Sequence, residues 1–340
     1  MNPDFKAAHL AAEFVHDSPI ITCRFDPKGA LVFASAEDRK ILRWDITDAK
    51  KKTVFAGHDS WVWAMAFSHD GQTLITAGGD DQLIWWPAAA EKPEPIRKVA
   101  AHKGWIRVLA VSPDGKLLAS GGNDRLVKVW NLADGKLVHE LKGHELDVYS
   151  VCFHPKGGSL LSGDLLCKVN QWDLATGKLT RTFDAKDLAH YDKGQQVYFG
   201  GVRGIALSPD GKQLAVAGLH KATDPLGNVH EPHVMRFEWD SAKHVKSHTA
   251  NDIKNGVLWG CRFHPDGTFM GVCGGGSGGF LIFWNATDEK PVHQFKLPDL
   301  AREMDLHPDG IQVITAHYGR KVHLTKLAAK PAAPAPAKKA

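Results

Sequence analysis

Histidine, hydroxyl and tryptophan residues recur in this sequence at a constant spacing. In three copies a serine or threonine follows a histidine by 18 positions, and a tryptophan comes after it. Two copies also hold an aspartate before the tryptophan, whereas the third has Leu166 at that position. The three sets are His58, Thr76, Asp80 and Trp86; His102, Ser120, Asp124 and Trp130; and His144, Ser162 and Trp172.

A histidine, a hydroxyl and a carboxylate are the parts of a nucleophilic triad. A triad occurs once in an enzyme, however, and here the same residue types come back in several copies. A buried tryptophan N–H needs an acceptor, and a hydroxyl can accept that hydrogen bond while it donates one of its own. A neutral histidine can accept a hydrogen bond through one ring nitrogen and donate to a carboxylate through the other. We therefore predict structural hydrogen-bond sets that fix the strands of each repeat, and we expect no catalytic residue and no enzyme.

The repeat that carries these sets is marked by a tight turn. Its last residue is glycine at 29, 71, 115, 157, 211, 267 and 310, so the steps are 42, 44, 42, 54, 56 and 43 residues. Glycine supplies the positive φ that such a turn requires. The seven copies read FDPKG (25–29), FSHDG (67–71), VSPDG (111–115), FHPKG (153–157), LSPDG (207–211), FHPDG (263–267) and LHPDG (306–310).

Short apolar runs flank each turn, and a further run ends in tryptophan, as in residues 41–45 and 169–173. These runs predict four short antiparallel strands per unit, joined by hairpins. One such sheet cannot bury both of its faces, so units of this kind stack radially into a propeller.

The sequence resembles the WD-repeat family in these motifs. The Gly-His pairs at Gly57-His58 and Gly143-His144, the Pro-Asp-Gly turns, and the Trp-Asp pairs at Trp44-Asp45 and Trp172-Asp173 carry the resemblance, which covers about residues 7–327. The resemblance implies an all-β, seven-bladed β-propeller of four-stranded antiparallel sheets, with strands running from the axis outward.

The ring should close through the first strand of the chain. The last unit stops after a third strand at residues 321–327, and residues 7–15 form a lone strand before the first complete unit. We predict that this strand completes the last blade, so that no long sheet edge is left open. The expected organisation is one propeller, 1–327, and a disordered Ala/Pro/Lys tail, 328–340.

Bulky aromatic and arginine side chains gather at two positions of each repeat, six and four residues before the end of the innermost strand. In the seven units these are Pro19 and Ile21, Trp61 and Trp63, Trp105 and Arg107, Asp147 and Tyr149, Gly201 and Arg203, Val257 and Trp259, and Leu300 and Arg302. The family resemblance places these positions at the mouth of the central channel, on the top surface.

Tryptophan, tyrosine and arginine dominate binding hot spots. The alternative is that the rings only fill the rim of the channel and pack on each other. We predict that the following residues bind a partner: Trp61, Trp63, Trp105, Arg107, Tyr149, Arg203, Trp259 and Arg302.

Three long connections, residues 185–201, 219–233 and 248–256, should leave on the same surface. The second carries His220, Asp224, His230, Glu231 and His233, which invites a metal, but we expect no strand or helix to position them. The glycine run 271–279 lacks the Gly-Lys-Ser/Thr of a phosphate loop, so we interpret it as an elongated turn.

Composition narrows the function classes. The net charge is +4, of which Lys330, Lys338 and Lys339 in the tail supply three charges, so the near-neutral body does not suggest nucleic-acid binding. Five cysteines without a C-x-x-C pair argue against a disulfide framework and a zinc site. No signal peptide or transmembrane segment stands out, so we expect a cytoplasmic protein that is monomeric by itself and does not bind membranes.

The function that we predict is a non-enzymatic scaffold without a cofactor. It binds a protein or peptide partner of acidic or C-terminal carboxylate character at the channel mouth. The alternative is a propeller hydrolase, or a small-ligand or metal-binding protein, that uses the 219–233 loop and the central cavity.

Overall fold

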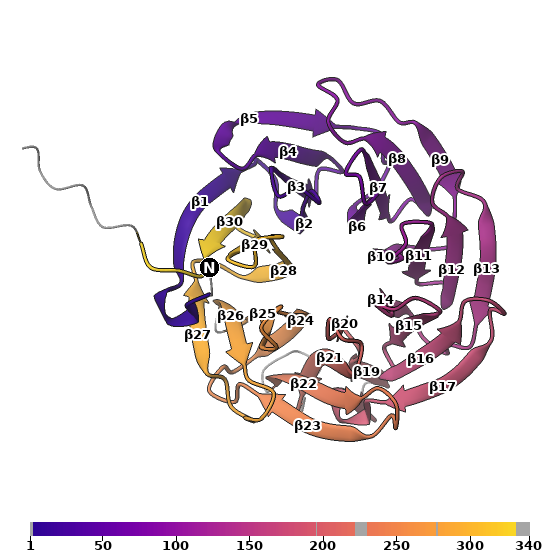
Figure 1. The fold of residues 1–340 in the computed structure, drawn as a ribbon, viewed down its shortest axis with the longest axis vertical. Helices are drawn as coiled ribbons and strands as arrows, with labels where there is room; N and C mark the ends of the chain where they lie inside the picture. The colour runs from indigo at the N-terminus through magenta and orange to yellow at the C-terminus, as the bar shows by residue number, and fades with distance from the viewer. Residues whose placement is uncertain (1–2, 195, 222–229, 277, 331–340) are drawn as a thin grey trace, which may run out of the picture.

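The fold is a closed ring of seven four-stranded antiparallel sheets, seen in a computed structural model (Figure 1). The structure describes residues 3–194, 196–221, 230–276 and 278–330. This architecture is the seven-bladed β-propeller that the repeats predict. The expected tail lies almost entirely outside the described residues.

Each blade runs from an innermost strand at the axis to an outermost strand at the rim (Figure 1). The first blade is β2 (Ile20–Phe25), β3 (Leu31–Ala36), β4 (Ile41–Asp45) and β5 (Asp48–Phe55). The second is β6 (Val62–Phe67), β7 (Thr73–Gly78), β8 (Gln82–Pro87) and β9 (Arg97–Ala100). The third is β10 (Ile106–Val111), β11 (Leu117–Gly122), β12 (Leu126–Asn131) and β13 (Leu137–Lys142).

The remaining blades follow the same order. The fourth is β14 (Val148–Phe153), β15 (Ser159–Asp164), β16 (Lys168–Asp173) and β17 (Leu179–Asp184). The fifth is β20 (Gly204–Leu207), β21 (Gln213–His220), β22 (Glu231–Glu238) and β23 (His244–Thr249). The sixth is β24 (Gly256–Phe263), β25 (Phe269–Gly275), β26 (Gly278–Trp284) and β27 (His293–Leu297). The seventh is β28 (Ala301–Leu306), β29 (Gln312–His317), β30 (Lys321–Lys326) and β1 (His9–Val15).

The seven turn glycines all have positive φ, from +71° to +89°. This confirms the predicted turn between the first and second strand of every blade, because a residue with a Cβ is strained in that conformation. The helices of the described residues are two 3₁₀ turns, η1 (Phe5–Ala7) and η2 (Lys186–Leu188). Neither is long or apolar enough to cross a membrane.

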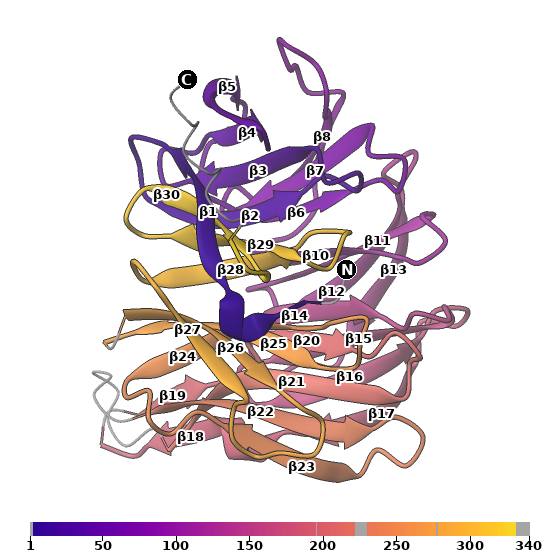
Figure 2. The same ribbon diagram turned by 60° about the vertical axis from the view of Figure 1, so that its left-hand side comes forward.

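The first strand closes the ring as predicted. β1 pairs antiparallel with β30, the third strand of the last blade, from His9↔Lys326 to Val15↔Lys321 (Figure 2). Phe14 is fully buried, and its ring centroid lies 5.7 Å from that of Trp44 in the first blade. The N-terminal strand therefore joins the last blade to the first.

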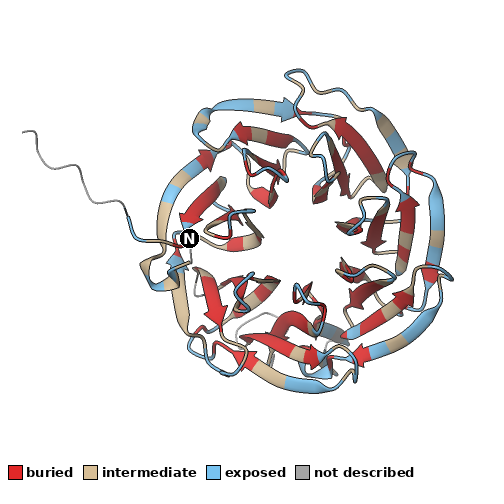
Figure 3. Ribbon diagram, in the orientation of Figure 1, coloured by how far each residue is buried: buried red, intermediate tan, exposed pale blue. Residues whose placement is uncertain are grey.

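The hydrophobic core lies between neighbouring blades. One cluster joins Phe33 and Phe55 of the first blade to Met65 and Trp86 of the second. The middle strands are mostly buried, whereas the outermost strands are exposed along one face (Figure 3). Trp239 follows the third strand of the fifth blade, β22, and is only half buried, whereas Trp44 and Trp172 lie within the third strands of their blades and are buried.

Three sequence interpretations of the connections need correction. The 185–201 connection contains a hairpin, β18 (Ala189–Asp192) and β19 (Val197–Gly200). Part of the 219–233 segment belongs to the long strands β21 and β22 instead of a loop. The glycine run is mainly strand too, because β25 and β26 pair as far as Gly275↔Gly278.

Candidate partner-binding site at the channel mouth

A β-bulge interrupts the innermost strand of six blades at the same position. The register slips between Val62 and Ala64, for example, so that Trp63 has no partner on β7. A bulge leaves one residue unpaired and re-aims its side chain. The bulged residues are Ile21, Trp63, Arg107, Tyr149, Trp259 and Arg302.

In the fifth blade Arg203 takes the equivalent place directly before β20, where its N–H donates to the Ala217 carbonyl over 2.9 Å. The bulge also breaks the regular alternation of side chains along the strand. Simple alternation would place Trp61, Trp63 and Met65 on one face, but Met65 is buried between blades whereas Trp61 is 40% exposed.

These side chains surround one cavity of about 420 Å³, which we call the mouth cavity. We use the name mouth cluster for the eight residues predicted to bind a partner. Seven of them line the cavity, and the eighth, Trp105, stacks on Trp63. The full lining is Ile21, Thr22, Glu37, Trp61, Trp63, Arg107, Tyr149, Arg203, Trp259, Arg302 and Glu303.

Arg107 is held inside a box of aromatic rings. Its guanidinium carbon lies 4.5 Å from the ring centroid of Trp105, 4.7 Å from that of Trp63 and 5.0 Å from that of Tyr149. The Trp63 and Trp105 rings are stacked, with centroids 5.8 Å apart. Arg107 Nε also donates to Asn123 Oδ1 over 2.9 Å, so the guanidinium is fixed in orientation.

Arg203 extends the same arrangement to the other side of the mouth. Its guanidinium carbon lies 4.6 Å from the Tyr149 ring centroid and 5.6 Å from that of Trp259. Alternating arginines and aromatic rings thus form an arc from the second blade to the sixth. Cation–π contacts of this kind hold both partners rigid and still leave donors of the guanidinium to face a ligand.

Burial acts on the charges of this arc. It lowers the pKa of Arg107 and of Arg203, and the nearby Tyr149 hydroxyl partly offsets that effect. An arginine pKa starts so high that both guanidinium groups remain charged. Trp63 Nε1 and Arg203 Nε are buried donors without an acceptor among the described residues.

The opposite side of the mouth is neutralised by acids. Arg302 Nη1 donates to Glu37 Oε1 over 3.1 Å, and Arg24 Nη2 lies 3.4 Å from Glu303 Oε2. Burial disfavours the Arg24 charge, but Glu303 and Asp305 outweigh it and raise the Arg24 pKa above its usual value.

Sequence reasoning missed a second series of positions at the mouth, the residue directly after the second strand of a blade. Glu37 follows β3, Asn123 follows β11 and Tyr318 follows β29. Tyr318 lies with its ring centroid 4.7 Å from the Arg302 guanidinium carbon. An alignment of the seven repeats at this position, like the one at the innermost strand, would have identified all three residues.

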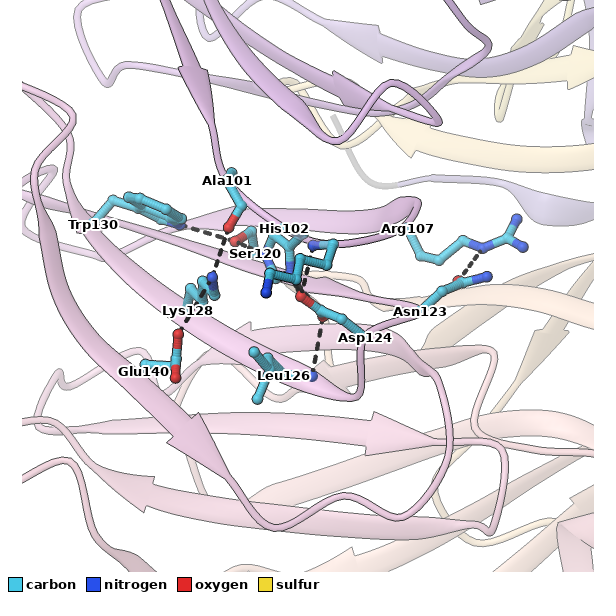
Figure 4. A network of polar contacts seen from close by, with 11 residues as sticks. Ala101, His102, Arg107, Ser120, Asn123, Asp124, Leu126, Lys128, Trp130 and Glu140 are labelled. Atoms are coloured by element: carbon cyan, nitrogen blue, oxygen red, sulfur yellow. Dashed lines mark hydrogen bonds and ion pairs between the residues drawn. The ribbon is translucent and has the colours of Figure 1, made fainter.

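The hydrogen-bond sets lie inside the blades, away from the cavity. In the third blade Trp130 Nε1 donates to Ser120 Oγ over 2.9 Å, and Ser120 Oγ lies 2.7 Å from His102 Nε2 (Figure 4). The same chain joins Trp86, Thr76 and His58 in the second blade, and Trp172, Ser162 and His144 in the fourth. Ser120 is fully buried, so this hydroxyl is out of reach of a substrate.

A carboxylate completes all three sets, which corrects the expectation for the fourth blade. His58 Nδ1 bonds Asp80, and His102 Nδ1 bonds Asp124, each over 2.8 Å. His144 Nδ1 bonds Asp164 at the same distance, although the expected position holds Leu166. Asp164 ends β15 and also accepts the N–H groups of Leu166 and Lys168, so it reaches the histidine from a position two residues earlier.

The histidines of the 219–233 segment do not converge on a metal. His220 and His233 lie on paired strands, and their rings stack with centroids 4.6 Å apart. Glu231 is occupied by Lys221 at 3.3 Å and Lys254 at 3.4 Å. Within the described ranges no three His, Cys, Asp or Glu residues form a group that could hold a metal ion. Asp224 lies outside those ranges.

The fold and the phased repeats define a class of protein, the WD-repeat β-propellers. The family model described as WD domain, G-beta repeat, matches residues 10–45, 49–86, 93–131 and 135–173. Each match begins in or before the outermost strand of one blade and ends with the third strand of the next, which is how the sequence repeat straddles the blades. The comparison therefore identifies WD repeats in the first four blades, and the seven-bladed fold is the one that the resemblance to the WD-repeat family implies.

Several proteins resemble the chain in part. Transcription initiation factor TFIID subunit 5 of Caenorhabditis elegans is 28% identical over 142 residues, 42% of this chain and 22% of that protein. Polyadenylation factor subunit 2 of Gibberella zeae is 39% identical over 140 residues, 41% of this chain and 22% of that protein. Nuclear distribution protein nudF of Aspergillus niger is 26% identical over 176 residues, 46% of this chain and 40% of that protein. The chain spans about a fifth of the length of the first two relatives.

Proposed function

We propose that this protein is a non-enzymatic scaffold that captures a segment of a partner protein at the channel mouth. Two of the similar proteins are named as subunits of factors, which supports a role in assembling proteins. We propose further that the partner segment is acidic, and that the chain acts as a monomer in the cytoplasm without binding nucleic acid. The hydrogen-bond sets would then serve stability alone.

One observation carries the proposal. The mouth cluster presents rigid aromatic rings and charged guanidinium groups around one cavity, and two buried donors there have no acceptor in the part of the chain that the structure describes. Trp63 Nε1 and Arg203 Nε can each donate to a partner, because no acceptor among the described residues occupies them. A partner segment that supplies acceptors and apolar surface would match this lining.

The double variant Trp63→Ala with Arg107→Ala tests this site. We expect it to lose the partner that the parent chain recovers by affinity capture and mass spectrometry. Its melting temperature should stay close to that of the parent, because both side chains lie at the mouth instead of between the blades.

Ser120→Ala is the matched control. It removes the acceptor of the Trp130 N–H, so we expect a loss of about 1–3 kcal/mol in the free energy of unfolding. Partner capture should persist, because Ser120 does not line the mouth cavity. If the double variant keeps every partner of the parent chain, the proposed site is wrong.

A further inference from the structure

We propose that the mouth cavity is a carboxylate-binding site, in which Arg107 and Arg203 hold a carboxylate of a polypeptide. The carboxylate would belong to a chain end or to an Asp or Glu side chain, and an apolar residue beside it would lie in an adjoining groove. This inference rests on the proposed function and names the chemistry that the mouth recognises.

The charges at the mouth are distributed unevenly. Arg302 and Arg24 have carboxylate partners, Glu37 and Glu303. Arg107 and Arg203 have no carboxylate within ion-pair distance among the residues that the structure describes. Asp147 attracts Arg107 electrostatically, but only from beyond that distance. The positive charge that a ligand can neutralise therefore lies on the side of the third to fifth blades.

The hydrogen-bonding groups on that side are donors. A guanidinium and an indole N–H donate and cannot accept, so a matching ligand must bring acceptors. Arg203 Nε and Trp63 Nε1 are buried and have no acceptor within the described ranges, and both residues line the cavity. A carboxylate fits, since it accepts through both oxygens and binds guanidinium groups in a forked geometry.

The acids at the mouth favour a monoanion over a dianion. Glu37 and Glu303 line the same cavity as Arg107 and Arg203, the two arginines without a carboxylate partner among the described residues. A carboxylate carries one negative charge, whereas a phosphorylated side chain carries about −1.5 to −2 at pH 7. The acids that neutralise Arg302 and Arg24 would repel the additional charge of a phosphate.

A second hollow continues the site. A groove of about 450 Å³ between the sixth and seventh blades shares Trp259 and Arg302 with the mouth cavity. Val257, Leu300 and Tyr318 also line it, and the residues Gly274–Gly276 contribute no side chains. A peptide that is anchored by its carboxylate in the cavity can pass Trp259 and place an apolar side chain in this groove.

Randomised tetrapeptide pools test the proposal on the full-length chain. One pool has free C-terminal carboxylates, a second has C-terminal amides, a third has amides with one fixed aspartate, and a fourth replaces that aspartate with phosphoserine. Mass spectrometry measures the fraction of each pool that the immobilised protein retains. We expect at least a tenfold preference for a carboxylate pool over the amide pool, with apolar residues enriched among the retained peptides.

Single substitutions localise the binding. Arg107→Gln and Arg203→Gln should each weaken retention roughly 10- to 100-fold, as expected for charge-assisted hydrogen bonds of about 1.5–3 kcal/mol. Arg181→Gln is the matched control, because Arg181 also stacks on aromatic rings, Phe183 and Trp239, but on the outer side of the propeller. It should leave retention unchanged.

The outcomes separate this inference from the proposed function. Preference for the first pool identifies a chain end as the source of the carboxylate, and preference for the third identifies an acidic side chain. Equal retention of the amide pool, stronger retention of phosphoserine, or no retention of either carboxylate pool overturns the inference. In each of these three cases the proposed function still stands if Trp63→Ala with Arg107→Ala loses the protein partner.

Discussion

Deleting residues 1–15 should leave a chain that no longer unfolds cooperatively at the parental temperature and that self-associates. The deletion removes β1, which exposes the backbone edge of β30 along the register from Lys321 to Lys326. It also removes Phe14 from the core, where loss of a buried Phe side chain alone costs about 3–5 kcal/mol. A typical domain has only about 5–15 kcal/mol of stability, so most of it would be lost.

Thermal melts with size-exclusion chromatography would measure this effect. Val15→Ala is the control, because Val15 is 53% exposed at the end of the same strand and should melt like the parent. A synthetic peptide of residues 7–15 should partly restore the truncated chain by pairing with β30. Truncated protein that melts like the parent and stays monomeric would contradict the role that we assign to β1.

Acidification to pH 5 should destabilise the protein by several kcal/mol through its buried histidines. Burial lowers the pKa of His317 and of His248 to about 4, and that of His233 to about 3. Since the unfolded value is about 6.5, the folded state favours the neutral rings. Their stabilisation is complete above pH 6.5 and is lost as the pH falls toward 4, at about 1.4 kcal/mol per histidine and pH unit.

Urea denaturation at pH 7.5 and pH 5.0 measures the difference in the free energy of unfolding. His233→Phe should reduce that difference by about a third, because His233 is buried and neither of its ring nitrogens has a partner within the described part of the chain. His69→Gln is the control and should change nothing, since His69 is exposed in a turn. Equal stability of the parent chain at both pH values would show that protonation of these histidines is not coupled to unfolding, and it would contradict the prediction.

Periodicity made the fold predictable. The turn glycines repeat at nearly constant steps, so each copy supports the assignment of the others. The lone strand before the first unit then matches the fourth strand that the last unit lacks. The structure brings the mouth cluster together for the same reason, because residues at one phase of the repeat must lie at one level of the ring.

Other features depended on contacts that a sequence does not display. No residue type marks the bulge at Trp63 or Arg107, because the bulge arises from pairing with the next strand. Asp164 replaces the expected aspartate from a shifted position that a spacing rule cannot anticipate. The polar sequence that leads up to His220 is typical of a loop, although backbone pairing with β22 extends β21 as far as His220.

Photo-crosslinking from the channel mouth directly tests whether the partner binds there. Trp61 is replaced by benzoylphenylalanine, and His69, in the turn at the opposite end of β6, is replaced in a control protein. We expect the captured partner to form a covalent adduct with the protein labelled at position 61 and none with the protein labelled at position 69. Adducts from position 69 alone would show that the partner binds elsewhere and would contradict the assignment of the channel mouth.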